Sequence, residues 1–128
     1  MMSSPYQSLR EEALAANLEI PRLGLAILTW GNASAFDAQR GVLAIKPSGL
    51  PYGELSADSM VVLDLDGKVV EGRLRPSSDT KTHIVLYRAF GKIGGVCHTH
   101  SPHAVAWAQA RRPLPCLGTP HADQTAGP

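Results

Sequence analysis

Two histidines separated by one residue, His98 and His100, have the residue type and spacing that bind metal ions. They end an apolar run, 93–97, that predicts a buried strand, and because side chains alternate along a strand both imidazoles should project to the same side. Neutral imidazole nitrogens are ready ligands of zinc and related divalent ions. An isolated pair of this kind is also common on exposed strands, but burying two histidines without a partner costs desolvation free energy. The pair therefore predicts half of a metal site.

Three short segments rich in small polar residues are candidates for anion binding. Residues 76–79, Pro-Ser-Ser-Asp, place two hydroxyls and a carboxylate just before a predicted helix, which by itself is also an ordinary helix N-cap. Gly31-Asn32 and residues 46–49, Lys-Pro-Ser-Gly, follow predicted strands. If the three converge, their hydroxyls, amide and backbone N–H groups form a phosphate cradle, to which Lys46 adds charge. Any one of them alone is equally well explained as a turn.

Composition narrows the class of protein. The 128 residues, 44% hydrophobic and 18% charged, predict a single domain with one core. A net charge of +1 with interspersed signs provides no basic face, so no nucleic-acid partner is expected. No apolar run approaches membrane-spanning length and the first residues lack the features of a signal peptide, so we expect a cytoplasmic protein without a membrane partner. Cys97 is expected to be a small buried residue, and with Cys116 it implies no disulfide framework.

Periodicity and turn signals predict an α/β fold. The expected elements are a helix that starts at Ser4-Pro5 and ends before Pro21, strands over 25–30 and 42–45 separated by a polar loop at 31–34, a hairpin over 60–70 with an Asp-Gly turn, a helix over 80–90, a strand over 94–100 and a helix over 101–110. Because strands outnumber helices and include a hairpin, we expect a mixed or largely antiparallel sheet with covering helices.

Seven strings, in order along the chain, resemble the class II aldolase and adducin head family, and within it the sugar-phosphate epimerases. They are Leu28-Thr-Trp-Gly-Asn32, Ile45-Lys-Pro-Ser-Gly49, Val69-Val-Glu-Gly72, Pro76-Ser-Ser-Asp-Thr80, His98-Thr-His-Ser101, Trp107-Ala-Gln109 and His121-Ala-Asp123. The resemblance covers nearly the whole chain. It implies a three-layer α/β/α fold around a mostly antiparallel central sheet, with residues 1–128 as the N-terminal portion of a single domain.

The resemblance also implies roles for individual residues. His98 and His100 would hold Zn²⁺, or another divalent metal such as Mn²⁺, with Asp79 at or beside the metal. Asp123 would be an acid/base residue that works across a subunit boundary of a homotetramer. The residues expected to hold a sugar-phosphate substrate, chiefly its phosphate, are Gly31, Asn32, Ser48, Gly49, Ser77 and Ser78, with Lys46 adding charge.

The implied reaction is the interconversion of L-ribulose 5-phosphate and D-xylulose 5-phosphate. No carbonyl acidifies the C–H bond at C4, so the epimerase-like route is retro-aldol cleavage of the C3–C4 bond, rotation of the aldehyde fragment and re-addition to its other face, which needs two acid/base groups. One alternative is an L-fuculose-1-phosphate-type aldolase, which releases the aldehyde; Asp79, where aldolase relatives tend to place a glutamate, favours the epimerase. The other is a non-catalytic adducin-like head or an inactive fragment, although adducin-type heads lack the metal histidines that are present here.

The other three histidines are not expected to bind the metal, and the end of the sequence differs from the family pattern. His83 and His103 fall in predicted helices and are expected to be structural, whereas His121 either orients Asp123 or is a simple loop histidine. The family's third metal-binding histidine and its acid/base tyrosine lie downstream of the matched strings. Residues 124–128 also differ from the family pattern, so the expectation is a truncated or frameshifted product, or part of a longer protein.

Overall fold

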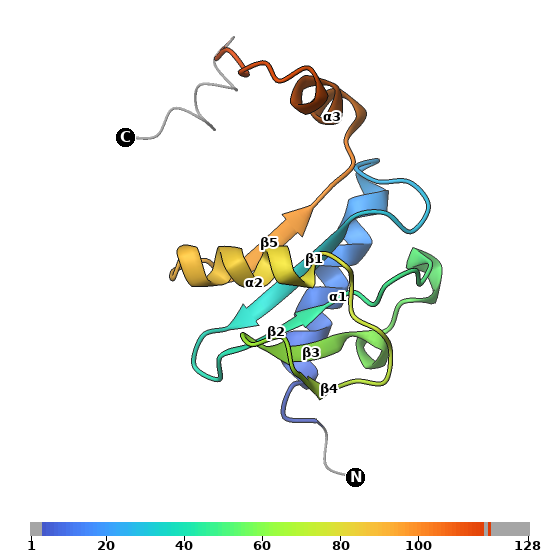
Figure 1. Cartoon of the computed structure of the whole chain (residues 1–128). Helices are drawn as coiled ribbons and strands as arrows, with labels where there is room; N and C mark the ends of the chain where they lie inside the picture. Colours follow the sequence, from blue (N-terminus) through green and yellow to red (C-terminus); the bar gives the residue numbers. More distant parts are fainter. Residues whose placement is uncertain (1–3, 117, 119–128) are drawn as a thin grey trace.

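The computed structural model describes residues 4–116 and 118, which form an antiparallel sheet with helices (Figure 1). The elements are α1 (Gln7–Arg22), β1 (Asn32–Asp37), β2 (Val42–Ile45), the 3₁₀ turns η1 (Tyr52–Glu54) and η2 (Ala57–Ser59), β3 (Val61–Asp64), β4 (Val69–Glu71), α2 (Thr80–Ala89), β5 (Gly95–His98) and α3 (Pro102–Gln109). The five strands lie in the order β4-β3-β2-β1-β5, and every neighbouring pair is antiparallel. The predicted α/β class and antiparallel sheet are confirmed.

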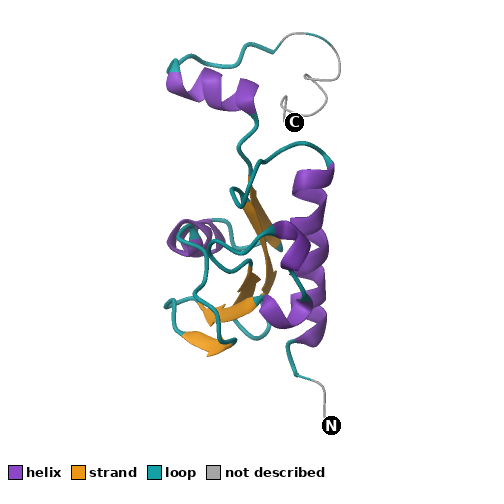
Figure 2. Cartoon of the chain, turned by 90° about the vertical axis from the view of Figure 1, so that its right-hand side faces the viewer, coloured by secondary structure: helices purple, strands orange, loops and turns teal. Residues whose placement is uncertain are grey.

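Helices α1 and α2 cover opposite faces of this sheet (Figure 2). Successive side chains of β2 point to opposite faces, so Ala44 packs in a cluster with Ala13 of α1 while Leu43 packs in a cluster with Ile84 of α2. All four residues of β2 are buried, because the strand has neighbours on both edges and a helix over each face. Helix α3 lies apart from the sheet in both views (Figures 1 and 2).

The prediction of a strand over 25–30 is wrong. This segment is a loop, and β1 instead begins at Asn32, inside the predicted polar loop. Positive φ angles of 54° at Leu28 and 76° at Gly31 break the extended conformation, and the apolar side chains of the segment stay largely outside, with Leu28 74% exposed. Small side chains suit β1 better, because Ala33 and Ala35 are buried against neighbouring elements.

The ends of the first helix also differ from the prediction. Helix α1 begins at Gln7 rather than at Ser4-Pro5, and it runs through Pro21 to Arg22. Because proline has no backbone N–H, the last turn of α1 lacks one helical hydrogen bond at Pro21. Gly24, at a φ of 68°, provides the left-handed residue that ends the helix, and its N–H donates to the Pro21 carbonyl at 3.0 Å.

The other predicted elements are found, but β5 is not buried. The strand at 42–45, the hairpin, and the helices near 80–90 and 101–110 lie where the sequence placed them. Strand β5 pairs only with β1 among the described residues, so it forms an edge, and Cys97 is exposed rather than buried as expected. Within the described ranges no helix is both long and apolar enough to cross a membrane.

Candidate active site

Four segments from distant parts of the chain surround a cavity of about 420 Å³. They are the loop before β1, the loop after β2, the segment before α2 and the end of β5. The residues that line the cavity are Thr29, Trp30, Gly31, Asn32, Lys46, Pro47, Ser48, Gly49, Ser77, Ser78, Asp79, His98 and His100. Every candidate residue named from the sequence is therefore in one place, except Asp123, which with His121 lies outside the described residues.

Backbone pairing brings these segments together. Asn32 of β1 lies directly across from His98 of β5 in the antiparallel register. The loop after β2 pairs with the segment before α2, since the Ser77 N–H donates to the Lys46 carbonyl at 3.1 Å and the Ser48 N–H donates to the Arg75 carbonyl at 2.8 Å. The convergence of the three polar segments is thus a property of the backbone hydrogen bonds as well as of the side chains.

Asp79 connects Asn32 of β1 to the imidazole of His98. Its Oδ2 lies 2.9 Å from Nδ1 of His98 and accepts a hydrogen bond from Nδ2 of Asn32 at 2.7 Å. Burial alone would raise the pKa of Asp79, but the hydrogen bonds from Asn32 and His98 outweigh it, and the pKa lies below its usual value. Asp79 is therefore a carboxylate at neutral pH, able to orient the His98 ring.

The two histidines lie side by side, although the strand predicted over 94–100 ends at His98 and His100 lies beyond it. The ring centroids of His98 and His100 are 4.8 Å apart, and the Trp30 ring lies 5.4 Å from that of His100. With Nδ1 of His98 facing Asp79, its Nε2 is left to bind a metal, an arrangement typical of metal-ligating histidines. Among the described residues no group of three or more His, Cys, Asp or Glu side chains is arranged to hold a metal ion. The donor chemistry of two imidazoles and an orienting carboxylate fits a divalent metal.

Lys46 is a buried cation without a carboxylate partner. Its side chain is 2% exposed, and its Nζ donates to the Thr29 carbonyl at 3.1 Å. No ion pair includes this lysine within the described part of the chain. Desolvation lowers the pKa of Lys46. A buried ammonium that faces only neutral oxygens provides a positive charge to an anion entering the cavity.

Gly31 must be glycine because two elements meet at its α-carbon. Its φ is 76°, and a Cβ placed there would lie 2.9 Å from the His98 carbonyl oxygen and 3.1 Å from Cβ of Ala26. Gly49 also has a positive φ, 74°, but a Cβ added there would have no neighbouring atom within 4 Å. Gly31 therefore allows the loop before β1 to approach the end of β5 closely.

Sequence reasoning missed three residues of the cavity wall and one beneath it. Thr29, Trp30 and Pro47 line the cavity, and all three fall within strings quoted for the family resemblance, so the signal was present. Tyr52 was missed entirely: its hydroxyl lies 2.7 Å from the Trp30 carbonyl oxygen, below the cavity. It follows Pro51 in a stretch, residues 49–55, that carries no chemical motif.

His83 and His103 do not line the cavity. His83 is 1% exposed, with Nδ1 2.7 Å from Oγ of Ser34, which in turn lies 2.6 Å from the Tyr87 hydroxyl. Burial is the main cause that lowers the pKa of His83 to about 4, so this imidazole is neutral. His103 is exposed on α3.

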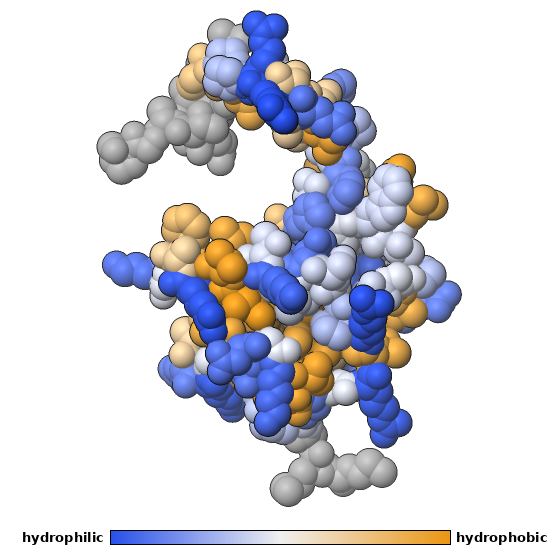
Figure 3. Space-filling model, in the orientation of Figure 1, coloured by the Kyte–Doolittle hydropathy of each residue, from blue (hydrophilic) through white to orange (hydrophobic). Residues whose placement is uncertain are grey.

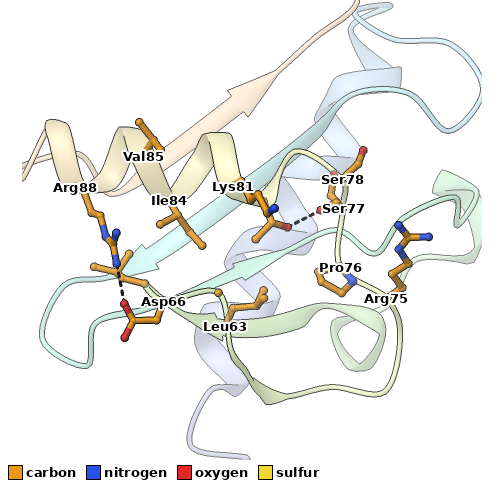
Figure 4. Close-up of a pocket in the computed structure, with 13 residues that line it drawn as sticks. Leu63, Asp66, Arg75, Pro76, Ser77, Ser78, Lys81, Ile84, Val85 and Arg88 are labelled. Carbon is orange, nitrogen blue, oxygen red and sulfur yellow. Dashed lines mark hydrogen bonds and ion pairs between the residues drawn. The ribbon is translucent and has the colours of Figure 1, made fainter.

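A larger hollow, of about 830 Å³, lies between α2 and the β3–β4 hairpin (Figure 4). Ile84 and Leu63 form part of its apolar surface, and hydrophobic residues gather near α2 on this face of the molecule (Figure 3). Its one carboxylate, Asp66, is paired with Arg88 at 2.8 Å, and no histidine lines it. The titratable groups that could carry acid/base or metal chemistry are in the smaller cavity, which is therefore the candidate active site.

Comparisons with known proteins show the family of this chain. The model of the class II aldolase and adducin N-terminal domain matches residues 11–128. The chain is 56% identical over 121 residues to L-ribulose-5-phosphate 4-epimerase UlaF from Salmonella paratyphi B (strain ATCC BAA-1250 / SPB7), covering 94% of this chain and 53% of that protein. It thus spans about half the length of the curated relatives it matches.

Solved structures show the same architecture. An L-fuculose 1-phosphate aldolase superposes with a TM-score of 0.80 at 33% identity, over 89% of this chain and 53% of the other. The L-fuculose-1-phosphate aldolase from Thermus thermophilus superposes with a TM-score of 0.73 at 24% identity, over 90% of this chain and 58% of the other, and shows the fold alone. The chain belongs to the class II aldolase and adducin N-terminal domain family.

Proposed function

We propose that this chain forms the metal-binding and phosphate-binding part of an epimerase that interconverts L-ribulose 5-phosphate and D-xylulose 5-phosphate. The observation that carries the proposal is one cavity whose lining includes both a buried cation and a histidine pair with a carboxylate. Lys46, with the hydroxyls of Ser48 and Ser77, provides a cationic end, and the histidine pair with Asp79 provides a metal-binding end. The identity to L-ribulose-5-phosphate 4-epimerase supports this substrate class.

The cationic end would hold the substrate phosphate. The Lys46 ammonium is already desolvated, so an anion that reaches it meets a charge screened little by water. Hydroxyls from Ser48 and Ser77 and the open backbone at Gly49 add neutral donors. A phosphate fixed there keeps the aldehyde fragment in the cavity between bond cleavage and re-addition.

The histidine end would hold the metal, zinc or manganese, through His98 and His100. When bound, a divalent ion supplies Lewis-acid stabilisation of the negative charge that develops on oxygen as the C3–C4 bond breaks. We place Asp79 beside the metal, because its Oδ2 already accepts from His98 and Asn32. This carboxylate holds the His98 ring so that Nε2 faces the ion.

Asn32 provides a substrate contact. Its Nδ2 donates to Asp79 and to Oγ of Ser77, and because a carboxylate only accepts hydrogen bonds the amide orientation is determined. Its Oδ1 is buried without a hydrogen-bond partner among the described residues. A buried acceptor left unpaired costs about 1–3 kcal/mol. Because this oxygen is buried, a sugar hydroxyl would reach it and remove that cost only if the amide turns toward the cavity when substrate binds.

We further propose a three-layer α/β/α fold, which the positions of α1 and α2 on opposite faces of the sheet support, and assembly as a homotetramer. Asp123, outside the described residues, would be one of the acid/base groups. An L-fuculose-1-phosphate-type aldolase is the second candidate, because the solved aldolase at 33% identity shares the architecture.

Zinc content tests the metal end directly. After dialysis against zinc and then buffer, the wild-type chain should retain stoichiometric zinc by mass spectrometry, and His98→Asn should lose it. His103→Asn is the matched control, since His103 is an exposed histidine outside the cavity. Equal zinc in the wild type and His98→Asn would refute the ligand assignment.

Product analysis separates the two enzymes. Incubation with L-ribulose 5-phosphate, followed by NMR, should yield D-xylulose 5-phosphate under the epimerase proposal. An aldolase would instead accumulate dihydroxyacetone and glycolaldehyde phosphate, the fragments of the C3–C4 bond. Fragments as the main product would contradict the epimerase and favour the second candidate.

A further inference from the structure

Tyr52 contacts two groups that line the cavity. Its hydroxyl contacts the loop before β1, and its ring contacts the Lys46 ammonium. Its hydroxyl is 2.7 Å from the carbonyl oxygen of Trp30 and 3.0 Å from that of Gly31, within donating distance of both. Burial is the main cause that raises the pKa of Tyr52 to about 12, so the hydroxyl keeps its proton and remains a donor. The loop before β1, which has positive φ angles at Leu28 and Gly31, is therefore tied down by one buried side chain.

The ring of Tyr52 supports the buried lysine. Nζ of Lys46 lies 4.9 Å from the ring centroid, within the range of a cation–π interaction. The other acceptors of this ammonium are neutral carbonyls, those of Thr29 at 3.1 Å and Pro47 at 3.5 Å. An aromatic face stabilises a cation without neutralising it, whereas a carboxylate here would form an ion pair and compete with an incoming anion.

We propose that Tyr52 is the positioning residue of the anion-binding end: its hydroxyl holds the Gly31 turn, and its ring holds the Lys46 ammonium in place for a phosphate. Tyr52 does not itself line the cavity, so it acts through Gly31 and Lys46 rather than on the ligand. The inference rests on the proposed function only in taking the ligand at this end to be a phosphate group.

Tyr52 also packs in a small core cluster with Ile20, Ala26 and Ala33, so a purely structural role must be separated from positioning. Tyr52→Phe removes the hydroxyl and keeps the ring under Lys46. Tyr52→Leu removes both. The matched control is Tyr6→Leu, because Tyr6 also carries a cation over its ring, Arg40 at 5.9 Å, and does not line the cavity.

The experiment is a titration with inorganic phosphate at constant ionic strength, followed through the amide NMR signals of Gly31 and Gly49. We expect Tyr52→Leu to weaken the phosphate Kd by about tenfold, the scale of a desolvated cation–π contact. Tyr52→Phe should weaken it by about threefold, the scale of one neutral hydrogen bond, and should shift the Gly31 amide signal in the free protein. Tyr6→Leu should leave the Kd unchanged.

Two readouts distinguish positioning from general stability. In a Lys46→Met background, Tyr52→Leu should weaken the remaining phosphate affinity only by the roughly threefold effect of the lost hydroxyl, as Tyr52→Phe does there, whereas a structural defect would add to it. The ε-methylene protons of Lys46 should show a ring-current shift that Tyr52→Phe keeps and Tyr52→Leu loses. If Tyr52→Leu does not fold, the threefold change and the Gly31 shift in Tyr52→Phe carry the test.

The inference would be overturned if a folded Tyr52→Leu variant binds phosphate with unchanged affinity. It would also be overturned if Tyr52→Phe changes neither the phosphate affinity nor the Gly31 amide signal. A wild-type chain that does not bind phosphate would overturn both this role and the cationic end of the cavity. Wild-type phosphate binding that Tyr52→Leu weakens, with dihydroxyacetone and glycolaldehyde phosphate as the main products from L-ribulose 5-phosphate, would refute the proposed function and leave the role of Tyr52 standing.

Discussion

Replacing Gly31 with alanine should disrupt the contact between the loop before β1 and the end of β5. The added Cβ would lie 2.9 Å from the His98 carbonyl oxygen, a backbone atom in a paired strand that has little freedom to move. It would also lie 3.1 Å from Cβ of Ala26 and 3.4 Å from the Tyr52 hydroxyl. The same substitution forces alanine to adopt a φ of 76°.

The two costs can be separated with a second glycine. Gly24 has a φ of 68° and no atom within 4 Å of a Cβ at that position, so Gly24→Ala meets only the conformational cost. That cost is about 1–2 kcal/mol for an L-residue in the left-handed region. The contact at Gly31 adds about 1–3 kcal/mol, the range found for overpacking. Gly31→Ala should therefore lower the free energy of unfolding by about 2–5 kcal/mol.

Urea unfolding followed by circular dichroism measures the difference. We expect Gly31→Ala to lose at least about 1 kcal/mol more than Gly24→Ala, with unchanged m-values. Because the contact presses on the backbone of His98, zinc affinity should fall in Gly31→Ala and stay unchanged in Gly24→Ala. Equal losses of stability in the two variants would show that the close approach at Gly31 is relieved cheaply, and would refute the reasoning.

Two further predictions concern buried polar groups. His83 has a pKa lowered to about 4, chiefly by burial, with Asp79 opposing and His98 reinforcing the shift. Since the unfolded chain binds this proton near pH 6.5 and the folded chain does not, the free energy of unfolding should fall by about 2–3 kcal/mol as the pH decreases from 7 to 4. Urea unfolding across this range should show a smaller slope in a folded His83→Gln variant, and an equal slope would contradict the assignment. Asn17→Leu should destabilise by about 2–4 kcal/mol, because it leaves the N–H and C=O of Ala33 unpaired in the core; thermal unfolding checks this, and a loss below about 1 kcal/mol would argue against it.

Much of the site was predictable because its chemistry lies in short strings. The His-x-His spacing predicts that His98 and His100 share a side, and in the structure their rings do lie together. The three polar loops were each ambiguous alone, and it is the family resemblance that predicted a common ligand. Their convergence depends on backbone bonds such as Ser77 N–H to the Lys46 carbonyl, which no local pattern encodes.

The errors have a common physical origin in tertiary context. The apolar run from Leu25 resembles a strand, yet Gly31 must adopt a positive φ so that the loop can pass close to β5. Strand β5 was expected to be buried because its residues are apolar, but burial depends on neighbouring elements, and among the described residues only β1 pairs with it. Tyr52 could not be assigned a role from its own surroundings in the sequence, because its partners are 6 and 22 residues away along the chain.

The register between β1 and β5 links the helix α1 to the chemistry of the cavity. A slip of one residue would turn Asn32 and His98 to opposite faces and separate Asp79 from one of them. The pairing between β1 and β2 begins at Ser34 of β1. The backbone of Ala33, one residue earlier, therefore needs other hydrogen-bond partners. Asn17 of α1 supplies them: its Nδ2 donates to the Ala33 carbonyl at 2.9 Å, and its Oδ1 accepts from the Ala33 N–H at 2.8 Å. A buried amide outside the cavity thus holds the strand end on which Asn32 meets Asp79, and the geometry of the site extends into the hydrogen bonding of the core.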